Sequence, residues 1–177
     1  MIVIADITPI NYLILIDLIH IVSELFGQIV IPQAVLNELQ STQAPDKVRQ
    51  WLTHRPEWLV VREVQQEDPT LAHLDPGERE ALTLAQELRA ELILLDENRG
   101  RRETTSRGFN VTGTVGLLDR AGARGLIDVP NHLPGLKCSI SALRYAGRVA
   151  DRGTTCPQDF SFFVQSATKR RRTSTRT

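Results

Sequence analysis

The sequence predicts an α/β fold in which helices cover both faces of a parallel sheet, and three observations support this class. Short apolar runs alternate with segments whose apolar residues recur at helical spacing, which is the pattern of successive strand–helix–strand units. Several runs are continuously apolar, as in strands that are buried on both faces. The chain has 177 residues, 41% of them hydrophobic, which is enough for one domain with its own core.

The first elements follow from β-branched runs and helical spacing. Residues 1–5 (MIVIA) form an apolar run that ends at a charge, and they predict the first strand. Apolar residues at helical spacing over 11–26 predict a helix, which Asp17 interrupts and Gly27 ends. Residues 29–31 are again short and β-branched, and they predict the second strand.

The next four elements are marked by proline or by an amphipathic pattern. A proline begins a helix over 32–40, and residues 44–53 predict a further amphipathic helix. Residues 58–61 (WLVV) predict a strand. An Asp-Pro pair begins the clearest helix, over 75–90, in which alanine and leucine recur at helical spacing.

The last elements repeat the alternation. Residues 92–95 (LILL) predict a buried strand, and the polar segment 97–107 predicts a helix that ends before a glycine. A short strand is expected at 109–111, then a helix over 114–123 and a further strand over 126–129. Crossovers between the parallel strands are expected to be right-handed.

The net charge of zero combines two opposite imbalances. Residues 1–130 carry 12 Lys and Arg against 19 Asp and Glu, whereas residues 131–177 carry 9 against 2. We therefore predict one acidic domain over 1–130 and a basic C-terminal extension over 131–177, disordered at least over 165–177. The KRRR run in that extension is either a non-specific RNA contact or a solubilising tail.

The sequence predicts a cytoplasmic protein. The apolar stretch 2–22 contains Asp6, Asp17 and His20, which excludes a membrane span and a signal peptide. Cys138 and Cys156 lack metal-ligand spacing. Two thiols in such a chain fit a reducing compartment better than a disulfide framework.

Four carboxylates fall where a site is expected. Asp6 ends the first strand, Asp96 follows the strand at 92–95, Glu38 lies on the helix after the second strand, and Glu78 lies in the first turn of the helix over 75–90. Ligands of parallel sheets bind at the carboxyl ends of the strands. If the strands of Asp6 and Asp96 are neighbours, the four acids converge. Clustered carboxylates favour Mg²⁺ or Mn²⁺, which can support phosphodiester hydrolysis.

Each acid also has a purely structural interpretation. Asp6 is suited to cap the following helix, and Glu78 complements a helix dipole. Glu38 fits a solvated helix face, and Asp96 fits a turn. The order of the four acids along the chain is therefore more informative than any one of them.

This order carries a resemblance to a known family. The segments VIADITPINYL, IPQAVLNEL, LDPGEREALTLAQEL, LILLDENRGRR and VTGTVGLLDRAGARGLID resemble PIN-domain proteins, most closely the bacterial branch related to toxins of toxin–antitoxin pairs. The resemblance covers about residues 1–130. It implies a three-layer α/β/α sandwich around a central parallel sheet and Mg²⁺- or Mn²⁺-dependent ribonuclease activity. RNA, an antitoxin protein and a second copy of the chain are the expected partners, and no membrane is expected.

The resemblance assigns roles to individual residues. Asp6, Glu38, Glu78 and Asp96 match the family's catalytic and metal-binding acids, with Asp75 as a nearby substitute for Glu78. Glu97 is a further potential ligand. Four polar residues are expected to support these ligands or to contact substrate: Thr8, Asn98, Thr112 and Thr114. Helix capping explains Thr114 equally well.

Three alternatives remain open at this stage. Arg99, Arg101 and Arg102 either hold phosphates or form a solvated helix face. The divergent extension is compatible with a degenerate relative that binds RNA or a partner without cleaving. A receiver-type phosphoacceptor domain also gathers aspartates around Mg²⁺, but it pairs them with a lysine after a late strand, and Lys47 is the only lysine before residue 131.

Overall fold

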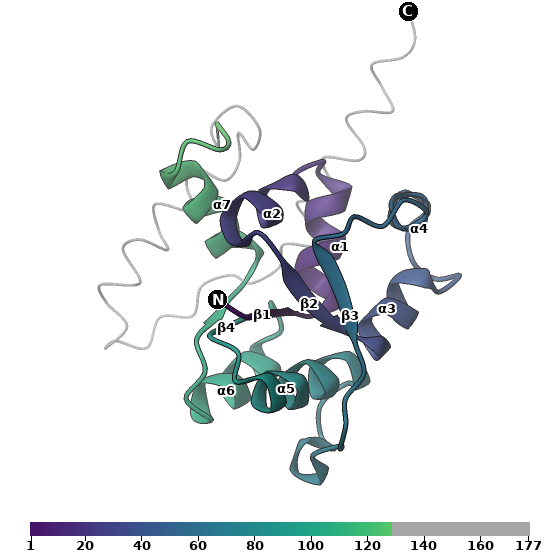
Figure 1. Ribbon diagram of the computed structural model, residues 1–177, viewed down its shortest axis with the longest axis vertical. Coiled ribbons are helices and arrows are strands. Elements are labelled where there is room, and N and C mark those ends of the chain that lie inside the picture. Colours follow the sequence, from purple (N-terminus) through teal and green to yellow (C-terminus); the bar gives the residue numbers. More distant parts are fainter. Residues whose placement is uncertain (129–177) are drawn as a thin grey trace, which may run out of the picture.

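The computed structural model describes residues 1–128, which form three layers around one parallel sheet (Figure 1). The order in the sheet is β3-β2-β1-β4-β5, and all paired neighbours are parallel. This confirms the predicted α/β/α sandwich. The strands are β1 (Val3–Ala5), β2 (Ile29–Pro32), β3 (Leu59–Arg62), β4 (Leu92–Leu94) and β5 (Val111–Thr112).

The helices lie on both sides of this sheet, with α5 and α6 on one side and α1, α2 and α7 on the other (Figure 1). None of the helices in residues 1–128 is long and apolar enough to span a membrane. The helices are α1 (Ile7–Leu15), α2 (His20–Phe26), α3 (Gln33–Gln40), α4 (Asp46–Leu52), α5 (Pro76–Leu88), α6 (Asn98–Ser106) and α7 (Thr114–Ala123), with a 3-10 turn at Pro69–Leu71.

The strands supply both hydrophobic cores by alternation. Val3 and Ala5 of β1 pack with α1, α2 and α7, whereas Ile4 between them packs toward α5. Leu94 of β4 lies in the first core and Ile93 in the second. Because successive strand residues point to opposite faces, continuously apolar strands are what a sheet covered on both faces requires.

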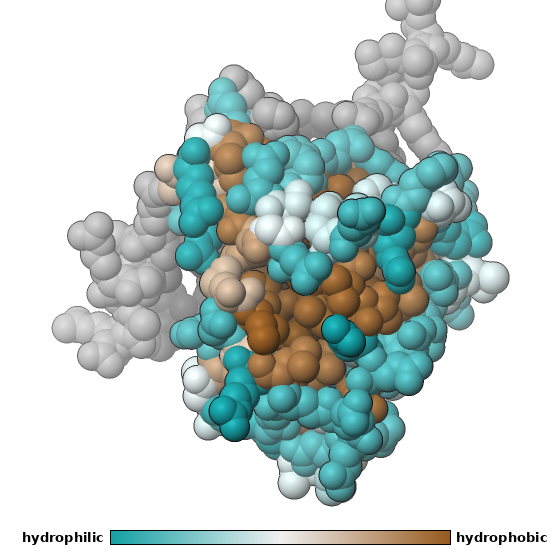
Figure 2. Space-filling model, viewed as in Figure 1, coloured by the Kyte–Doolittle hydropathy of each residue, from teal (hydrophilic) through white to brown (hydrophobic). Residues whose placement is uncertain are grey.

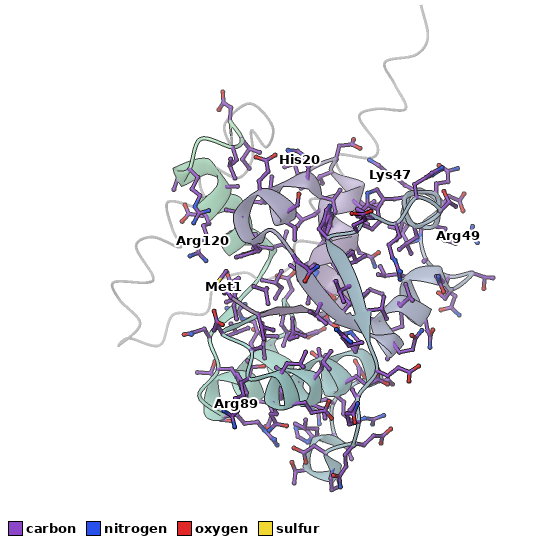
Figure 3. The ribbon with its side chains drawn as sticks, viewed as in Figure 1. Met1, His20, Lys47, Arg49, Arg89 and Arg120 are labelled. Atoms are coloured by element: carbon purple, nitrogen blue, oxygen red, sulfur yellow. The ribbon has the colours of Figure 1, made fainter. Side chains whose placement is uncertain are left out.

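One apolar surface remains exposed at the amino end of the chain. Figure 2 shows apolar side chains gathered over the strands at the centre of the viewed face, bordered by polar side chains. Met1 and Ile2 are large apolar residues that are 62% and 38% exposed. Met1 lies beside this region in Figure 3.

The predicted helix over 11–26 is two helices, as the interruption at Asp17 indicated. Asp17 adopts a positive φ of 63° between α1 and α2. Lys47 of α4 fixes this corner, because its Nζ lies 2.7 Å from an Asp17 carboxylate oxygen and 2.9 Å from the Leu15 carbonyl oxygen (Figure 3). The helical region begins earlier than predicted, at Ile7, because Asp6 caps it.

The strand predicted over 126–129 is wrong for its described part, since residues 126–128 lie in no strand. The Leu126 N–H donates to the Ala121 carbonyl at 3.0 Å, closing the turn after α7, and Ile127 is buried against the first core. Apolar packing under a helix end therefore explains this run. The predicted extension over 131–177, with its two cysteines and its KRRR run, lies outside the described residues.

Candidate functional site

Asp6 and Asp96 lie at the same edge of the sheet because β1 and β4 are neighbours. The register pairs Ala5 with Leu94, so each aspartate lies just beyond the carboxyl end of its strand. The Asp6 N–H continues the ladder by donating to the Leu94 carbonyl at 2.9 Å. Since the chain passes from β1 to β2 on one side and returns to β4 on the other, this edge is a switch point of the sheet, where α/β proteins bind ligands.

Asp6 is almost completely buried, with 2% of its surface exposed. Its carboxylate accepts the Thr8 N–H at 3.5 Å and caps α1. The capping role considered for Asp6 is therefore real, but it accounts for only part of the carboxylate. Burying a charge without a full set of partners is costly.

Glu38 reaches Asp6 beside the first turn of α5. A Cβ placed on Gly77 would lie 3.1 Å from a Glu38 carboxylate oxygen and 3.2 Å from an Asp6 carboxylate oxygen. The two oxygens are therefore separated by no more than the sum of these distances. The Gly77 N–H also bonds to Glu38. A side chain here would contact both carboxylates tightly, and they would have to shift by a few tenths of an ångström.

Glu78 adds a third carboxylate from the same turn of α5. It is 7% exposed, and its Oε1 is buried without a hydrogen-bond partner in the described part of the chain. Gly100 of α6 packs against it, since a Cβ at that residue would lie 2.5 Å from the same oxygen. The first turn of α5 thus places Glu78 between β1 and α6, with one oxygen unsatisfied.

Burial, and to a smaller extent neighbouring carboxylates, raises the pKa of all three acids. The pKa of Asp6 is raised to about 6, mainly by burial and to a smaller extent by the charges of Glu38 and Asp96, while the N–H bonds of the α1 cap lower it. Burial and the charge of Asp6 raise the pKa of Glu78 to about 7. Burial, with the neighbouring Asp75 carboxylate, also raises the pKa of Glu38. Unfavourable charge is therefore concentrated at this edge.

Glu38 is held in place by an interaction at the other end of its helix. α3 has no side-chain cap of its own. The Glu80 carboxylate of α5 instead accepts the Ala34 N–H at 2.9 Å. This bond fixes the start of α3 to α5 and thereby sets where Glu38 lies relative to Gly77.

Asp96 is held in a different way. The Thr114 N–H donates to one carboxylate oxygen at 2.8 Å, and the Thr114 hydroxyl donates to the other at 2.5 Å. The capping interpretation of Thr114 is therefore wrong: Thr114 is the first residue of α7, and its hydroxyl donates to Asp96 instead of accepting a backbone N–H of its own helix. Arg101 steadies the same strand end by donating to the Leu95 carbonyl at 2.8 Å.

The side chains of the remaining predicted site residues form no hydrogen bond to the four acids within residues 1–128. Thr8 contributes its backbone N–H to Asp6 and no hydroxyl bond within residues 1–128. The Thr112 carbonyl accepts the Leu95 N–H at 2.9 Å, and its hydroxyl faces Gly116 instead of bonding to Asp96. Asn98 is exposed on α6 and lines a surface groove.

Sequence reasoning missed three residues that shape the site, namely Gly77, Gly100 and Glu80. The two glycines lie inside helices, where glycine is unfavourable unless close packing requires it. That signal was readable in the sequence. Glu80 carried no such signal, because its partner Ala34 is 46 residues away.

The donor set fits a hard divalent cation. It consists of carboxylate oxygens, which Mg²⁺ and Mn²⁺ prefer, and the buried unsatisfied oxygen of Glu78 needs a positive partner. Within residues 1–128, no group of three or more His, Cys, Asp or Glu side chains is already arranged to hold a metal ion. Carboxylates repel one another when no cation is bound. They therefore favour positions farther apart than those they would occupy as ligands of one ion.

Comparisons with known proteins agree with this architecture. A family model described as PIN domain matches residues 2–147, which extends past the boundary predicted at residue 130. The chain is also similar to a solved structure of a PilT N-terminus domain protein from the hyperthermophilic archaeon Sulfolobus solfataricus P2. The TM-score is 0.52 at 19% sequence identity, over 68% of this chain and 93% of that chain, so this similarity shows the fold. No curated protein matches.

Proposed function

Because the chain belongs to the PIN-domain family, we propose that it is a divalent-metal-dependent ribonuclease that uses Asp6, Glu38, Glu78 and Asp96. PIN domains are generally nucleases and generally use divalent metal ions. The observation that carries the proposal is that Asp6 and Glu38 each place a carboxylate oxygen within 3.2 Å of one point beside Gly77, next to the unsatisfied buried oxygen of Glu78. A divalent cation would neutralise this cluster.

The residues have distinct tasks in this proposal. Asp6, Glu38 and Glu78 hold the ion, Mg²⁺ or Mn²⁺, and Asp96 completes the acidic edge. When bound, the ion would supply the positive charge that makes water a better nucleophile and stabilises the phosphate during hydrolysis. Thr114 orients Asp96 through two hydrogen bonds, and the α1 cap orients Asp6. Glu80 fixes α3 and with it Glu38.

The biological setting is part of the same proposal. The resemblance of the sequence to toxin–antitoxin toxins supports RNA as substrate, an antitoxin as protein partner, a homodimer or higher oligomer, and a cytoplasmic location. A small open reading frame directly upstream of the gene, whose product co-purifies with this chain, would support this setting. A lone gene whose product elutes as a monomer would count against it.

The activity is tested with purified full-length protein and a labelled single-stranded RNA. We expect cleavage with Mg²⁺ or Mn²⁺, none with EDTA, and none by Asp6→Asn. Glu57→Gln is the matched control, since Glu57 is an exposed acid that precedes β3 at the opposite edge of the sheet. Equal cleavage by Asp6→Asn and Glu57→Gln would refute the site. RNA binding without cleavage by the wild-type protein would favour a degenerate relative.

Lys47 removes the basis for a receiver-type phosphoacceptor. It is bound to Asp17 and to the Leu15 carbonyl at the end of α1. A phosphoacceptor site would require a lysine beside the aspartates, and residues 1–128 contain no other lysine.

A further inference from the structure

α6 is a helix without a single apolar side chain. Its nine residues read NRGRRETTS. It is attached to the protein by close packing of Gly100 and by polar contacts, in which Arg101 donates to the Leu95 carbonyl and Thr104 is fully buried. A surface helix usually buries an apolar stripe, so the composition of α6 requires another explanation.

The outer side of α6 forms one wall of an open surface groove of about 440 Å³. We call it the α6 groove, and all of its lining residues are polar. The lining residues are His73, Asn98, Arg99, Arg102, Glu103 and Ser106.

The charge in the α6 groove is positive. Arg99 and Arg102 are exposed and form no ion pair with any residue in 1–128. The Glu103 carboxylate lies 2.8 Å from Arg107, which also pairs with Asp68 at 2.6 Å, and 3.7 Å from His73. Two unmatched guanidinium groups thus lie together in a domain whose first 130 residues have an excess of acids.

The α6 groove begins next to the acidic site. Asn98 and Arg99 follow Asp96 after one intervening residue, at the carboxyl edge of the sheet. In the same turn of α6, Gly100 faces inward and packs against Glu78. One turn of helix therefore contacts the acidic site with its inner side and lines the α6 groove with its outer side.

We propose that the α6 groove binds the phosphate backbone of the RNA strand next to the bond that is cleaved, with Arg99 and Arg102 contacting phosphates. This rests on the proposed ribonuclease function. An acidic pocket repels a polyanion, so a substrate strand needs cationic contacts close by. The forked guanidinium group matches phosphate oxygens, and Asn98 and Ser106 offer further donors of the kind that contact phosphate and sugar.

A protein partner fits the α6 groove less well. Protein interfaces have an apolar, desolvated centre, and none of the groove's lining residues is apolar. Glu103 is the only acid in the lining, and it is paired with Arg107, which Asp68 shares. The chemistry of the lining therefore favours a nucleic-acid backbone over a protein surface.

The test is the salt dependence of RNA binding by the full-length chain. A 5′-labelled 12-nucleotide oligouridylate is titrated in EDTA, which prevents cleavage, at several NaCl concentrations. Arg99→Gln/Arg102→Gln should weaken binding roughly 10-fold at 0.1 M NaCl and lower the slope of log Kd against log salt by about 1.4, the loss of two phosphate contacts on a single strand. The C-terminal KRRR run is present in every variant, so its contribution cancels.

The matched control is Arg49→Gln/Arg55→Gln, which removes the same charge. Arg49 (Figure 3) belongs to α4, whose Val48 packs in the core on the other side of the sheet from α6, and Arg55 follows that helix in the sequence. The control should leave the slope unchanged. Equal slopes for the two double variants would overturn the proposal.

The two proposals can fail separately. A slope effect without any metal-dependent cleavage would support the α6 groove and contradict the ribonuclease. Metal-dependent cleavage without an effect on the salt slope would support the ribonuclease and contradict the α6 groove. Unchanged melting temperatures for both double variants would show that the comparison concerns binding and not folding.

Discussion

The two halves of the acidic site differ in how well the protein supplies hydrogen-bond partners to the carboxylates. In the half formed by β1, α3 and α5, Asp6, Glu38 and Glu78 crowd together, and one buried Glu78 oxygen has no partner within residues 1–128. In the half formed by β4 and α7, the Asp96 carboxylate receives an N–H and a hydroxyl from Thr114. The carboxylates of the first half therefore lack sufficient partners, whereas the Asp96 carboxylate of the second half has its hydrogen bonds supplied by the protein.

This difference indicates which carboxylates bind the metal ion and which one mainly supports the site. A satisfied carboxylate is fixed in position but has little need of a cation, whereas an unsatisfied cluster gains much from one. We therefore expect the first half to determine metal affinity. Asp96 should mainly place a negative charge near the metal ion and contribute less to metal affinity.

Glu78→Gln should cause a loss of cleavage comparable to that of Asp6→Asn. It removes the charge of the buried acid at almost constant volume, so both Mn²⁺ affinity and cleavage should fall by more than the roughly 100-fold that loss of an outer ligand partner costs. Titration calorimetry with Mn²⁺ and the RNA cleavage assay measure this. A loss no larger than that of Glu57→Gln would show that Glu78 only complements the dipole of α5.

Asp6→Asn should make the metal-free protein more stable at neutral pH. The pKa of Asp6 is about 6 in the folded state against 3.8 ordinarily, so wild-type stability is lost as pH rises through this window. Full ionisation costs about 3 kcal/mol. Asparagine caps α1 as well as aspartate does.

Urea unfolding in EDTA between pH 4 and pH 7 measures this effect. The stability gain of Asp6→Asn should be near zero at the acid end and grow towards neutrality. A gain that does not change with pH, or a loss at pH 7, would contradict the burial cost assigned to Asp6.

Thr114→Val should have a smaller effect on catalysis. It removes the hydroxyl bond to Asp96 but keeps the backbone N–H bond, so we expect a roughly 10-fold loss of cleavage and almost unchanged Mn²⁺ affinity. Thr114→Ser should restore cleavage. If Thr114→Val reduced Mn²⁺ affinity as strongly as Glu78→Gln, the division between the two halves would be wrong.

Glu80→Ala should have the smallest effect, through the position of Glu38. Loss of the acceptor for the Ala34 N–H should cost about 1 kcal/mol of stability, as for other helix caps, and weaken Mn²⁺ binding a few-fold. Glu80→Gln keeps an acceptor oxygen and should retain most of both. Thermal unfolding and Mn²⁺ titration of the pair give the answer, and equal behaviour of the two variants would exclude the capping role.

Much of this architecture could be predicted from the sequence. Continuous apolar runs identified the strands, and their placement before Asp6 and Asp96 identified the site edge. The outcomes for Thr114 and for residues 126–128 depended on tertiary contacts. A threonine at the start of a helix can cap that helix or hold a neighbouring acid. A short apolar run such as residues 126–128 can form a strand or pack as a turn. The role of Glu80 depends on how α5 meets α3, which no local pattern encodes.

Calorimetric titration of Mn²⁺ at pH 7 tests whether Asp6, Glu38 and Glu78 bind a divalent cation. Metal ligands must be deprotonated, so binding releases protons in proportion to the protonated fraction of the ligands. Since the pKa of Glu78 is about 7 and that of Asp6 about 6, titrations in buffers of different ionisation enthalpy should show proton release at pH 7 that disappears at pH 8.5 and is reduced in Glu78→Gln. Absence of Mn²⁺ binding, or binding without proton release at pH 7, would contradict the account.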